Sequence, residues 1–396
     1  MLLGGLRYLI PVIKEAHNLG YYVITCDYIP DNIAHKYSDE YINASVTDKE
    51  KILQIAKEKQ IDGIMSFAVD PGVTTVAYVC EKLGLPSIGS YESVNILQNK
   101  KLFREFLAKH NFNVPKAKGY TSVDDAISDI KYFNWPLMVK PVDSAGSKGV
   151  SKVENIDCFK EKIENAIRFS PTKQFIVEEF IESDGFPSDS ESLSIDGELV
   201  FFTLSNQRFD RNAANPYTPA GFTWPSKMER YHQEELRSEI QRLLSLLRMK
   251  TSIYNIEARI GIDNKAYIME VSPRGGGNRL AEMIKLATGV DLISYALRAA
   301  VGEEIINFTD KLIYNGFWGE IILHSDKEGY FEQLIIDNRI KELVYEIDLW
   351  VTKGSYIKSF TGANETIGTI VIKGDDQNQV DELVSNYKKW IQIIVN

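Results

Sequence analysis

The chain has 396 residues, of which 44% are hydrophobic and 25% are charged, and its 45 basic and 55 acidic residues give a formal net charge of −10. This length is too great for one ordinary core and predicts two or three domains. The acidic balance argues against nonspecific binding to nucleic acid. Because no apolar run approaches the roughly 18 residues that a membrane helix needs, we expect a cytoplasmic protein without a membrane partner.

Cysteine and histidine are sparse and scattered. Cys26, Cys80 and Cys158 show no CxxC spacing, which favours a reducing compartment without structural disulfides. The five histidines are equally dispersed, so their spacing indicates neither a zinc site nor a Ser/His/Asp triad.

Residues 1–95 alternate short apolar strands with amphipathic helices, which predicts a doubly wound parallel sheet. The expected elements are a glycine turn at Gly4-Gly5, helix 14–19, strand 22–25, helix 48–59, strand 63–67, helix 72–83 and segment 85–88. Ligands bind such sheets beyond the carboxyl ends of the strands. Here those ends are the turns at Gly4-Gly5, Asp27 and Asp70-Pro71.

A dinucleotide-binding domain, and with it an NAD-dependent oxidoreductase, is the rival interpretation of this region. Asp27 follows the glycine turn by about the distance expected of a ribose-binding acid. However, the residues after Gly4-Gly5 read LRYLIP, so the later glycines of the fingerprint are missing. The sequence therefore argues against an NAD site.

Residues 96–305 predict a mixed α+β region, and residues 306–396 predict a strand-rich one. The expected elements are a helix over 99–109 with Asn99 as its N-cap, strands 137–142 and 174–181, and a closing helix over 376–391. The polar segment 206–227 contains three prolines and predicts a loop over an active site. Arg208 and Arg211 on this loop are candidates to hold a substrate carboxylate.

A small-residue loop with the sequence DSAGSKG (143–149) follows the strand that carries Lys140. Its exposed backbone N–H groups suit phosphate oxygens, and lysines supply the compensating charge. The GxxxxGK[ST] spacing is absent and a strand is expected at 150–153, so this is not a Walker A loop. From the loop alone, a phosphate site and an ordinary hairpin end both remain open.

Residues 254–262 and 265–272 read as a β-hairpin, because Asp263-Asn264 suits a two-residue turn that needs positive φ. In that register Glu257 lies directly opposite Glu270. The expected core face pairs Ile256, Ala258 and Ile260 with Val271, Met269 and Tyr267. The other face carries Asn255, Glu257, Arg259, Glu270 and Ser272.

Facing carboxylates repel each other unless one is protonated or a cation lies between them. Oxygen ligands of this kind suit Mg²⁺ that arrives with a nucleotide phosphate. Two solvated glutamates on an edge hairpin are the alternative that the hairpin alone leaves open.

The order of these elements resembles the ATP-grasp superfamily, of the carboxylate–amine ligase type, over essentially the whole chain. Four motifs carry the resemblance: Lys100 in NKKLFREFL, Lys140 in MVKPVDSAGSKGV, the segment VEEFI at 177–181, and the pair Glu257 and Glu270 with Arg274 in EVSPR. The resemblance implies α/β and α+β architecture like that of biotin carboxylase and carbamoyl-phosphate synthase. Its parts are a doubly wound parallel pre-ATP-grasp domain (1–95), a two-lobed ATP-grasp region (96–305) and a strand-rich domain (306–396).

The resemblance also implies a role for each site residue. Lys100 would contact the α-phosphate of ATP, and Lys140 the α- and β-phosphates. The loop residues that would close over the phosphates are Ser144, Gly146, Ser147, Lys148 and Gly149. The adenine pocket would use Glu178 as lining, backbone groups of Glu179 and Ile181 to read the base edge, and Phe180 between them. The magnesium carboxylates, with Mn²⁺ as an alternative metal, would be Glu257 and Glu270, with Arg274 beside them.

Two positions depart from the family pattern. Ser272 stands where the family usually has an asparagine ligand to a second magnesium. The ribose-binding acid is either Asp189 or Glu191, of which we favour Glu191. Gly275, Gly276 and Asn278, after Arg274, are further candidates to hold an oxyanion or a substrate carboxylate.

The implied reaction activates a small carboxylate as an acyl phosphate and joins it to an amine, with release of ADP and phosphate. A bicarbonate-activating carboxylase or carbamoyl-phosphate-synthase-like enzyme is the alternative within this chemistry. A nucleotide-binding regulatory pseudoenzyme is the alternative from another class, against which the retained pair of glutamates argues. A homodimer is an open expectation, because similar architectures often dimerise.

Overall fold

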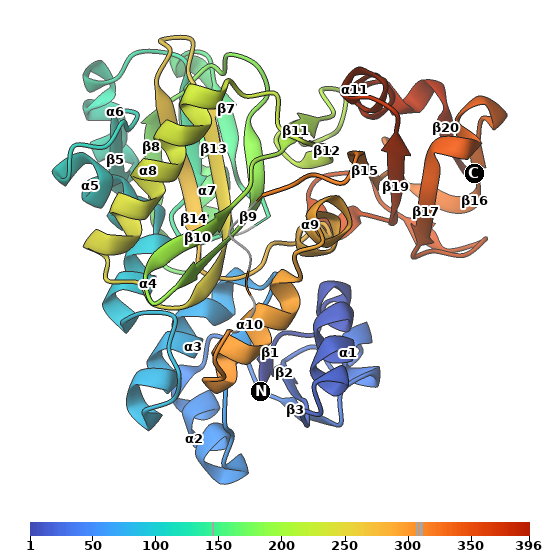
Figure 1. Cartoon of the computed structure of the whole chain (residues 1–396). Helices are drawn as coiled ribbons and strands as arrows, with labels where there is room; N and C mark the ends of the chain where they lie inside the picture. The colour runs from blue at the N-terminus through green and yellow to red at the C-terminus, as the bar shows by residue number, and fades with distance from the viewer. Residues whose placement is uncertain (145, 306–307, 309–311) are drawn as a thin grey trace.

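The computed structural model describes residues 1–144, 146–305, 308 and 312–396 (Figure 1). The chain forms one parallel sheet near its N-terminus and antiparallel sheets in the remainder, so the predicted mixed α/β and α+β class is confirmed. Ala145 of the predicted phosphate loop and residues 306–307, at the predicted start of the third domain, lie outside the described residues.

The N-terminal sheet has the strand order β3-β2-β1-β4, with every printed pairing parallel. Its strands are β1 (Leu2–Leu3), β2 (Ile24–Asp27), β3 (Glu40–Asn43) and β4 (Met65–Ser66). Its helices are η1 (Arg7–Leu9), α1 (Ile10–Asn18), η2 (Ile33–Lys36), α2 (Lys49–Lys59) and α3 (Asp70–Leu83). Strands β1, β2 and β4 are buried throughout, as expected when helices cover both faces of a parallel sheet.

The central region contains two antiparallel four-stranded sheets. The first has the order β5-β8-β6-β7, with β5 (Ala117–Tyr120), β6 (Leu137–Pro141), β7 (Ser151–Val153) and β8 (Phe175–Glu179). The second has the order β10-β9-β13-β14, with β9 (Ser188–Ile195), β10 (Glu198–Phe202), β13 (Ser252–Ile260) and β14 (Ala266–Ser272). The helices are α4 (Tyr91–Gln98), α5 (Lys100–Lys109), α6 (Val123–Ser128), η3 (Ile130–Tyr132), η4 (Ile156–Cys158), α7 (Phe159–Phe169) and α8 (Arg230–Leu246).

Helix α5 begins where the sequence places it. The side-chain Oδ1 of Asn99 accepts hydrogen bonds from the backbone N–H groups of Lys101 and Leu102, both at 3.1 Å. The predicted N-cap is therefore confirmed, and it places Lys100 in the first turn of the helix.

The C-terminal region forms a five-stranded sheet and a three-stranded sheet. The first has the order β11-β12-β15-β19-β17, with β11 (Asn206–Phe209), β12 (Pro219–Trp224), β15 (Phe317–Leu323), β17 (Val344–Leu349) and β19 (Gly368–Gly374). The second has the order β18-β16-β20, with β16 (Gly329–Ile336), β18 (Tyr356–Ile357) and β20 (Ile391–Val395). The helices from residue 280 onward are α9 (Leu280–Thr288), α10 (Leu292–Val301), η5 (Asn338–Leu343), η6 (Ala363–Glu365), α11 (Gln377–Ser385) and η7 (Tyr387–Lys389).

Two sequence predictions are wrong in this region. The closing helix ends at Ser385, and residues 391–395 form strand β20, because this segment is rich in β-branched residues that pack well in a sheet. The segment 206–227 contains a β-hairpin, whose strands β11 and β12 flank the loop 210–218 and whose strand β12 pairs with β15. Its polar composition suggested a loop, but several of its polar side chains are buried against α11.

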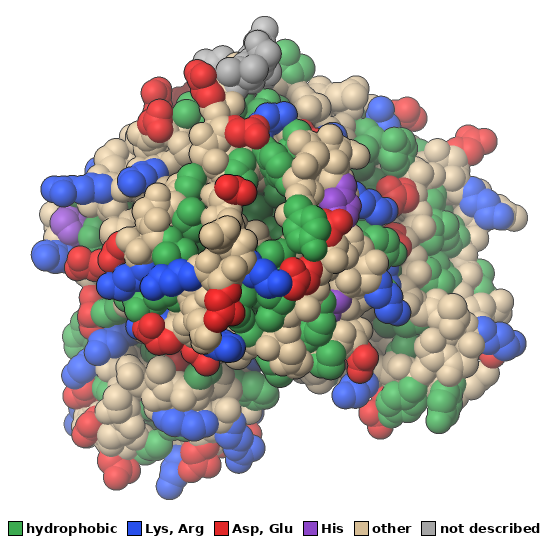
Figure 2. Space-filling view, turned by 90° about the horizontal axis from the view of Figure 1, so that it is seen from below, with side chains coloured by type: hydrophobic (Ala, Val, Ile, Leu, Met, Phe, Trp, Pro, Cys, Tyr) green, Lys and Arg blue, Asp and Glu red, His purple; other side chains and the backbone are tan. Residues whose placement is uncertain are grey.

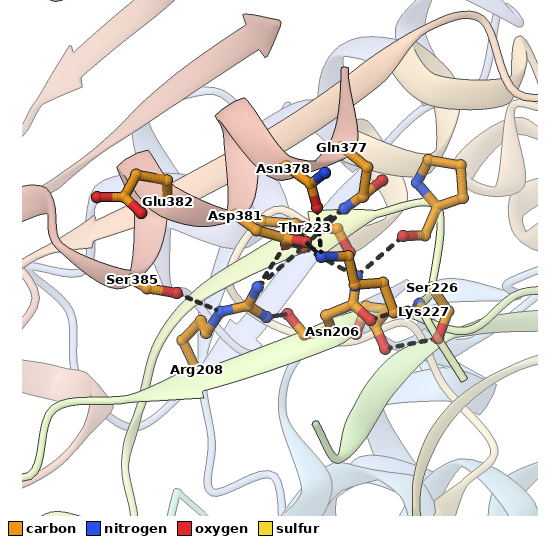
Figure 3. A network of polar contacts seen from close by, with 12 residues as sticks. Asn206, Arg208, Thr223, Ser226, Lys227, Gln377, Asn378, Asp381, Glu382 and Ser385 are labelled. Carbon is orange, nitrogen blue, oxygen red and sulfur yellow. Dashed lines mark hydrogen bonds and ion pairs between the residues drawn. The ribbon is translucent and has the colours of Figure 1, made fainter. Parts of the chain in front are cut away.

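The buried polar contacts between the hairpin and α11 centre on Arg208 and Asp381 (Figure 3). The guanidinium of Arg208 lies 2.5 Å from Oδ1 of Asp381, and its Nε donates to the hydroxyl of Ser385 at 3.0 Å. The hydroxyl of Thr223 donates to the same Asp381 oxygen at 2.5 Å. Arg208 therefore attaches the hairpin to the helix rather than lying on an exposed loop.

One hydrophobic core connects the three regions. It contains Leu9 and Ile13 near the N-terminus, Met283 and Ile284 of α9, and Val371 of β19. Figure 1 shows α9 and α10 running between the central sheets, the N-terminal domain and the C-terminal sheet. The segment after β14 is therefore enclosed by all three regions.

Acidic and basic side chains are interspersed on the face seen in Figure 2. Within the part of the chain that the structure describes, no helix combines the length and the apolar character needed to cross a bilayer.

We expect Asp381→Ala to lower the free energy of unfolding by about 3–5 kcal/mol, because it leaves the buried charge of Arg208 without its ionic partner. Urea denaturation followed by circular dichroism measures the change, with the exposed Asp375→Ala as the matched control. A loss below about 1 kcal/mol, the range of an exposed ion pair, would contradict a structural role for this pair.

Candidate active site

Strands β13 and β14 place Glu257 opposite Glu270, as the sequence predicts. The route to this pairing differs from the prediction. Gly261 pairs with Lys265, so the turn holds three residues and only its third, Asn264, has a positive φ, of 61°. This longer turn shifts the register by one residue, and a β-bulge beside Glu257 shifts it back.

Between the turn and the bulge, the core residues have other cross-strand partners than the sequence predicts. Ala258 faces Ile268 instead of Met269, and Ile260 faces Ala266 instead of Tyr267. The extra residue on β14 is Met269, between the two registers.

Strand β9 adds a third carboxylate to the facing pair. Asp189 lies opposite Glu257 on the other side of β13, so Asp189, Glu257 and Glu270 form a row across three strands, which we call the carboxylate row. Two residues further along the strands, Glu191, Asn255 and Ser272 form a second row on the same sheet face. From the sequence, Asp189 was considered only as a ribose ligand, because the alternation of residues within β9 does not reveal that β9 pairs with β13.

Burial and mutual repulsion disfavour full ionisation of the carboxylate row. Burial, followed by the charge of Glu257, raises the pKa of Asp189 well above its usual value. Burial, followed by the charge of Glu270, also raises the pKa of Glu257. The row therefore favours a bound cation or a shared proton.

Lys100 supplies one positive charge to this row. Its Nζ lies 3.0 Å from Oε2 of Glu270. Burial alone would lower the pKa of Lys100, but the charge of Glu270 and its hydrogen bond outweigh this effect and raise it.

Arg274 is held by a residue of the N-terminal domain. Its Nη2 lies 2.6 Å from Oδ1 of Asp70, and Nε donates to the same oxygen at 2.8 Å. Asp70 opens α3 directly beyond β4, at the sheet edge where ligands are expected. Burial alone would raise the pKa of Asp70, but the charge of Arg274 outweighs it and the pKa falls.

Ser272 belongs to the same network. Its hydroxyl donates to Oδ1 of Asp70 at 2.6 Å and accepts from Nε2 of Gln98 at 2.7 Å. One lone pair of the hydroxyl therefore stays available for a further ligand.

Lys140 and Arg104 flank the buried carboxylate of Glu178. Lys140 forms an ion pair with Oε1 of Glu178, and Nε of Arg104 donates to Oε2 at 2.8 Å. Burial alone would raise the pKa of Glu178, but the charges of Arg104 and Lys140 lower it to about 2. Burial lowers the pKa of Lys140, and the charge of Glu178 only partly offsets this. Sequence reasoning missed Arg104, although it follows Lys100 by one helical turn.

The predicted adenine segment leaves the end of β8. The backbone N–H of Glu179 donates to the carbonyl of Lys116, and that of Phe180 to the carbonyl of Pro136, both at 2.9 Å. The carbonyl of Ile181 accepts from Nη1 of Arg259 at 3.3 Å. These bonds hold the segment between the two central sheets.

The phosphate loop is attached to its surroundings at both ends. The carbonyl of Ser144 accepts from Nζ of Lys100 at 3.4 Å, and the hydroxyl of Ser147 donates to the carbonyl of Tyr217 at 3.1 Å. Among the described residues of the loop, Gly146, Ser147 and Gly149 have positive φ. Lys148 is exposed, and β7 follows the loop as predicted.

Two of the three glycines after Arg274, Gly275 and Gly276, closely approach neighbouring side chains. A Cβ on Gly275 would lie 2.2 Å from the ring of Phe67, and one on Gly276 would lie 2.6 Å from Oε1 of Glu191. The backbone N–H of Gly276 donates to that oxygen at 2.8 Å. Oδ1 of Asn278 accepts from a tyrosine hydroxyl at 3.3 Å.

Direct contacts join some of the predicted site residues, namely Lys100 with Glu270 and Ser144, Lys140 with Glu178, and Gly276 with Glu191. Two predicted residues lie elsewhere. Arg208 is part of the α11 network, and Arg211 is exposed after β11. Among contacts that the sequence did not reveal, those of Arg104, Asp70 and Asp189 are the most direct.

A separate cluster brings Asp210, His324 and Asp326 together as potential metal ligands. Nζ of Lys388 lies 2.6 Å from Oδ2 of Asp210 and 2.7 Å from Oδ2 of Asp326. This lysine already supplies the positive charge that the two carboxylates need.

Residues 133–282 match the family described as ATP-grasp domain. The carbamoyl phosphate synthase large chain of Thermoanaerobacter sp. (strain X514) is 25% identical over 274 residues, which cover 68% of this chain and 24% of that protein. The chain thus spans about a quarter of the length of that relative.

Two solved structures share the fold along the whole chain. The L-amino acid ligase from Bacillus licheniformis has a TM-score of 0.84 at 20% identity and covers 100% of this chain and 98% of its own. The phosphoribosylglycinamide synthetase from Anaerococcus prevotii has a TM-score of 0.76 at 20% identity, with the same coverage.

Glu191 predicts a pH-dependent stability of the metal-free protein. Its pKa is raised by burial from 4.5 to about 7, with the hydrogen bond from Gly276 opposing the shift. The folded state then holds a proton that the unfolded chain releases, so the free energy of unfolding falls as pH rises through this window. We expect Glu191→Gln to be more stable than the unsubstituted protein by up to about 3 kcal/mol near pH 8, with the gain vanishing toward about pH 4.5.

Urea denaturation at a series of pH values measures this difference, and Glu342→Gln on the exposed surface is the control. A gain that stays constant with pH would show that Glu191 keeps an ordinary pKa in the fold.

Proposed function

We propose that this chain, which contains an ATP-grasp domain and is homologous to the carbamoyl phosphate synthase large chain, is an ADP-forming ligase. It would activate a small-molecule carboxylate as an acyl phosphate and join it to an amine. The observation that carries the proposal is the carboxylate row with Lys100 paired to Glu270. Arg274 reaches the same strand through Asp70 and Ser272, and Lys140 reaches it through Glu178 and Arg104, which donates to the carbonyl of Met269.

The residues fit a divalent cation that accompanies the triphosphate. Glu257 and Glu270 offer carboxylate oxygens, and burial, followed by the charge of Glu270, raises the pKa of Glu257. A bound cation would relieve the repulsion between the two carboxylates. Bound Mg²⁺, or Mn²⁺ in its place, would neutralise charge on the triphosphate. The free lone pair of Ser272 would serve a second cation.

The two lysines suit the phosphate chain. Lys100 reaches both Glu270 and the carbonyl of Ser144, so it connects the carboxylate row to the small-residue loop. Lys140 approaches from the other sheet, where it pairs with Glu178, whose other oxygen accepts from Arg104. We infer that Lys100 contacts the α-phosphate and that Lys140 contacts the α- and β-phosphates.

The nucleoside would lie toward the end of β8. We infer that backbone groups of Glu179 and Ile181 read the adenine edge there, with Phe180 between them and Glu178 as lining. Glu191 is our candidate for the ribose hydroxyls, because its Oε2 is buried without a hydrogen-bond partner among the described residues.

The proposed reaction has two steps. An oxygen of the substrate carboxylate attacks the γ-phosphorus of ATP, and the bond between that phosphorus and the departing ADP oxygen breaks. The amine nitrogen then attacks the acyl carbon, loses a proton, and releases inorganic phosphate as the C–O bond breaks. Lys140, Lys100 and Arg274 reduce the repulsion between the two anionic reactants in the first step.

The substrate end of the site would lie beyond Arg274. Asp70 fixes the direction of the Arg274 guanidinium, so this charge is already oriented before a substrate arrives. The backbone of Gly275 and Gly276 and the amide of Asn278 are candidates to hold the oxyanion that forms when the amine attacks. We also place this chemistry in the cytoplasm, where Cys26, Cys80 and Cys158 would stay reduced.

Bicarbonate is the second candidate for the activated carboxylate. It is favoured by the similarity to carbamoyl phosphate synthase, although the chain spans only a quarter of that relative. ADP release with bicarbonate alone, compared with a panel of carboxylic acids and amino acids singly and in pairs, distinguishes the two candidates. A regulatory pseudoenzyme would release no ADP in any of these mixtures.

We expect Lys140→Ala to weaken MgATP binding by roughly ten- to a hundredfold, which corresponds to about 1.5–3 kcal/mol for a charge-assisted contact. The fold should persist because Arg104 still neutralises Glu178. Isothermal titration calorimetry measures the affinity, and Lys131→Ala on the exposed surface is the matched control. Equal affinities for the two folded variants would exclude Lys140 from the nucleotide site.

The reaction itself is tested with a substrate carboxylate labelled with ¹⁸O. Attack at the γ-phosphorus requires one labelled oxygen to appear in the released phosphate, with ADP as the other product. Glu270→Gln should bind nucleotide more weakly and abolish this transfer, because it removes one of the two facing carboxylates. Label in AMP, with pyrophosphate as co-product, would rule out the acyl phosphate.

A further inference from the structure

The phosphate loop is in contact with the connection between β11 and β12, residues 210–218. The side-chain amide of Asn215 donates to the carbonyl of Ser147 at 3.2 Å, and the hydroxyl of Ser147 donates to the carbonyl of Tyr217 at 3.1 Å. Oδ1 of Asn215 accepts from the backbone N–H of Tyr217 at 3.1 Å, which fixes the side chain within its own turn. The connection therefore holds Ser147 both through its backbone and through its side chain.

Asn215 also contacts the segment between β18 and β19 in the C-terminal region. Its Nδ2 donates to the carbonyl of Thr361 at 3.2 Å, and its backbone N–H donates to the carbonyl of Phe360 at 3.1 Å. A Cβ placed on Gly362 would lie 3.5 Å from the carbonyl oxygen of Gly146, so this segment and the phosphate loop also lie close together. The amide of Asn215 therefore joins the phosphate loop to the C-terminal region.

The segment that contains Phe360 is fixed by buried groups. The ring of Phe360 is fully buried and stacks on the imidazole of His324, with 4.0 Å between the ring centroids. The backbone N–H of Phe360 donates to the carbonyl of Ser325 at 3.0 Å. Nε2 of His324 lies 3.0 Å from Oδ2 of Asp210, which begins the β11–β12 connection. The His324–Asp210 pair therefore anchors both segments that meet at Asn215.

The phosphate loop needs such an external contact because its own sequence permits many conformations. Gly146 and Gly149 have positive φ, and Ser147 has a φ of 58°, in the left-handed region that non-glycine residues rarely adopt. A loop that becomes ordered only when a ligand binds loses conformational entropy at that moment, which weakens binding. Hydrogen bonds that order the loop beforehand reduce this loss.

We propose that Asn215 is a positioning residue that orders the phosphate loop before the nucleotide binds. The inference rests on the nucleotide site of the proposed function. Asn215 acts through the backbone of Ser147 and does not itself contact the nucleotide. Because the same amide nitrogen donates to Thr361, the affinity for the nucleotide depends on the contact between the phosphate loop and the C-terminal region.

Two substitutions remove the donor. Asn215→Asp places carboxylate oxygens against the carbonyls of Ser147 and Thr361, and Asn215→Ala removes the amide without adding charge. Asn212→Asp, at an exposed position of the same connection, adds the same charge and is the matched control. Both Asn215 variants should bind MgATP roughly tenfold more weakly than the unsubstituted protein, because two neutral hydrogen bonds are lost. Asn212→Asp should bind MgATP normally in the same calorimetric titration.

The order of the loop is measured separately by limited digestion with trypsin, because Lys148 is exposed within the loop. In the absence of nucleotide, cleavage after Lys148 should be roughly tenfold faster in Asn215→Ala than in Asn212→Asp, since a protease cuts the open form of a loop. Mass spectrometry identifies the fragments. Adenosine, which has no phosphates, should bind to all variants with equal affinity.

Unchanged MgATP affinity and unchanged cleavage after Lys148 in folded Asn215 variants would overturn the proposal. An equal loss of affinity for adenosine and for MgATP would also overturn it, because Asn215 would then support the whole site and not the phosphate loop. Circular dichroism establishes that each variant is folded.

Neither readout requires turnover, so the positioning role and the ligase function are tested independently. If no mixture of the panel releases ADP while the Asn215 variants expose Lys148 and bind MgATP weakly, the ligase function is contradicted and the positioning role stands. ADP release by the unsubstituted protein, together with normal MgATP affinity in Asn215→Ala, would leave the ligase standing and overturn the role of Asn215.

Discussion

Repulsion among three carboxylates that the backbone holds side by side is the constraint on which the site depends. Hydrogen bonding between β9, β13 and β14 sets Asp189, Glu257 and Glu270 in one row, so their Cβ atoms cannot move apart without breaking the sheet. Lys100 balances part of this charge. A bound metal–nucleotide complex would relieve the remaining repulsion among the carboxylates. The free energy of binding would therefore depend on the row of carboxylates that the sheet already holds in place.

The positive groups reach this row from separate parts of the chain. Lys140 comes from the first central sheet, and Arg274 follows β14 but is held by Asp70 of the N-terminal domain. The core that runs through α9 joins these regions, so the position of Arg274 depends on packing well beyond its own hairpin. A change in the contact between the domains would therefore alter the charge at the substrate end of the site.

The sequence predicted local features well and distant contacts poorly. The N-cap of α5 and the pairing of Glu257 with Glu270 follow from short-range patterns. The structure reaches this pairing by another route than the predicted one. Its turn has three residues instead of two, and a β-bulge restores the register. The alternation of apolar and polar residues reveals neither feature. The contacts of Asp70 and Arg104 join segments that are remote in sequence, and no single-chain pattern predicts them. The prediction of a loop over 206–227 was wrong because the polar residues suggested exposure, whereas Arg208 forms a buried ion pair with Asp381.

Direct observation of the metal tests the central claim most sharply. Crystals grown with Mn²⁺ and a non-hydrolysable ATP analogue, measured at the manganese absorption edge, would locate the ion independently of any activity. We expect an anomalous peak between the carboxylates of Glu257 and Glu270. A manganese peak confined to Asp210, His324 and Asp326, with the carboxylate row unliganded in a nucleotide-bound crystal, would contradict it.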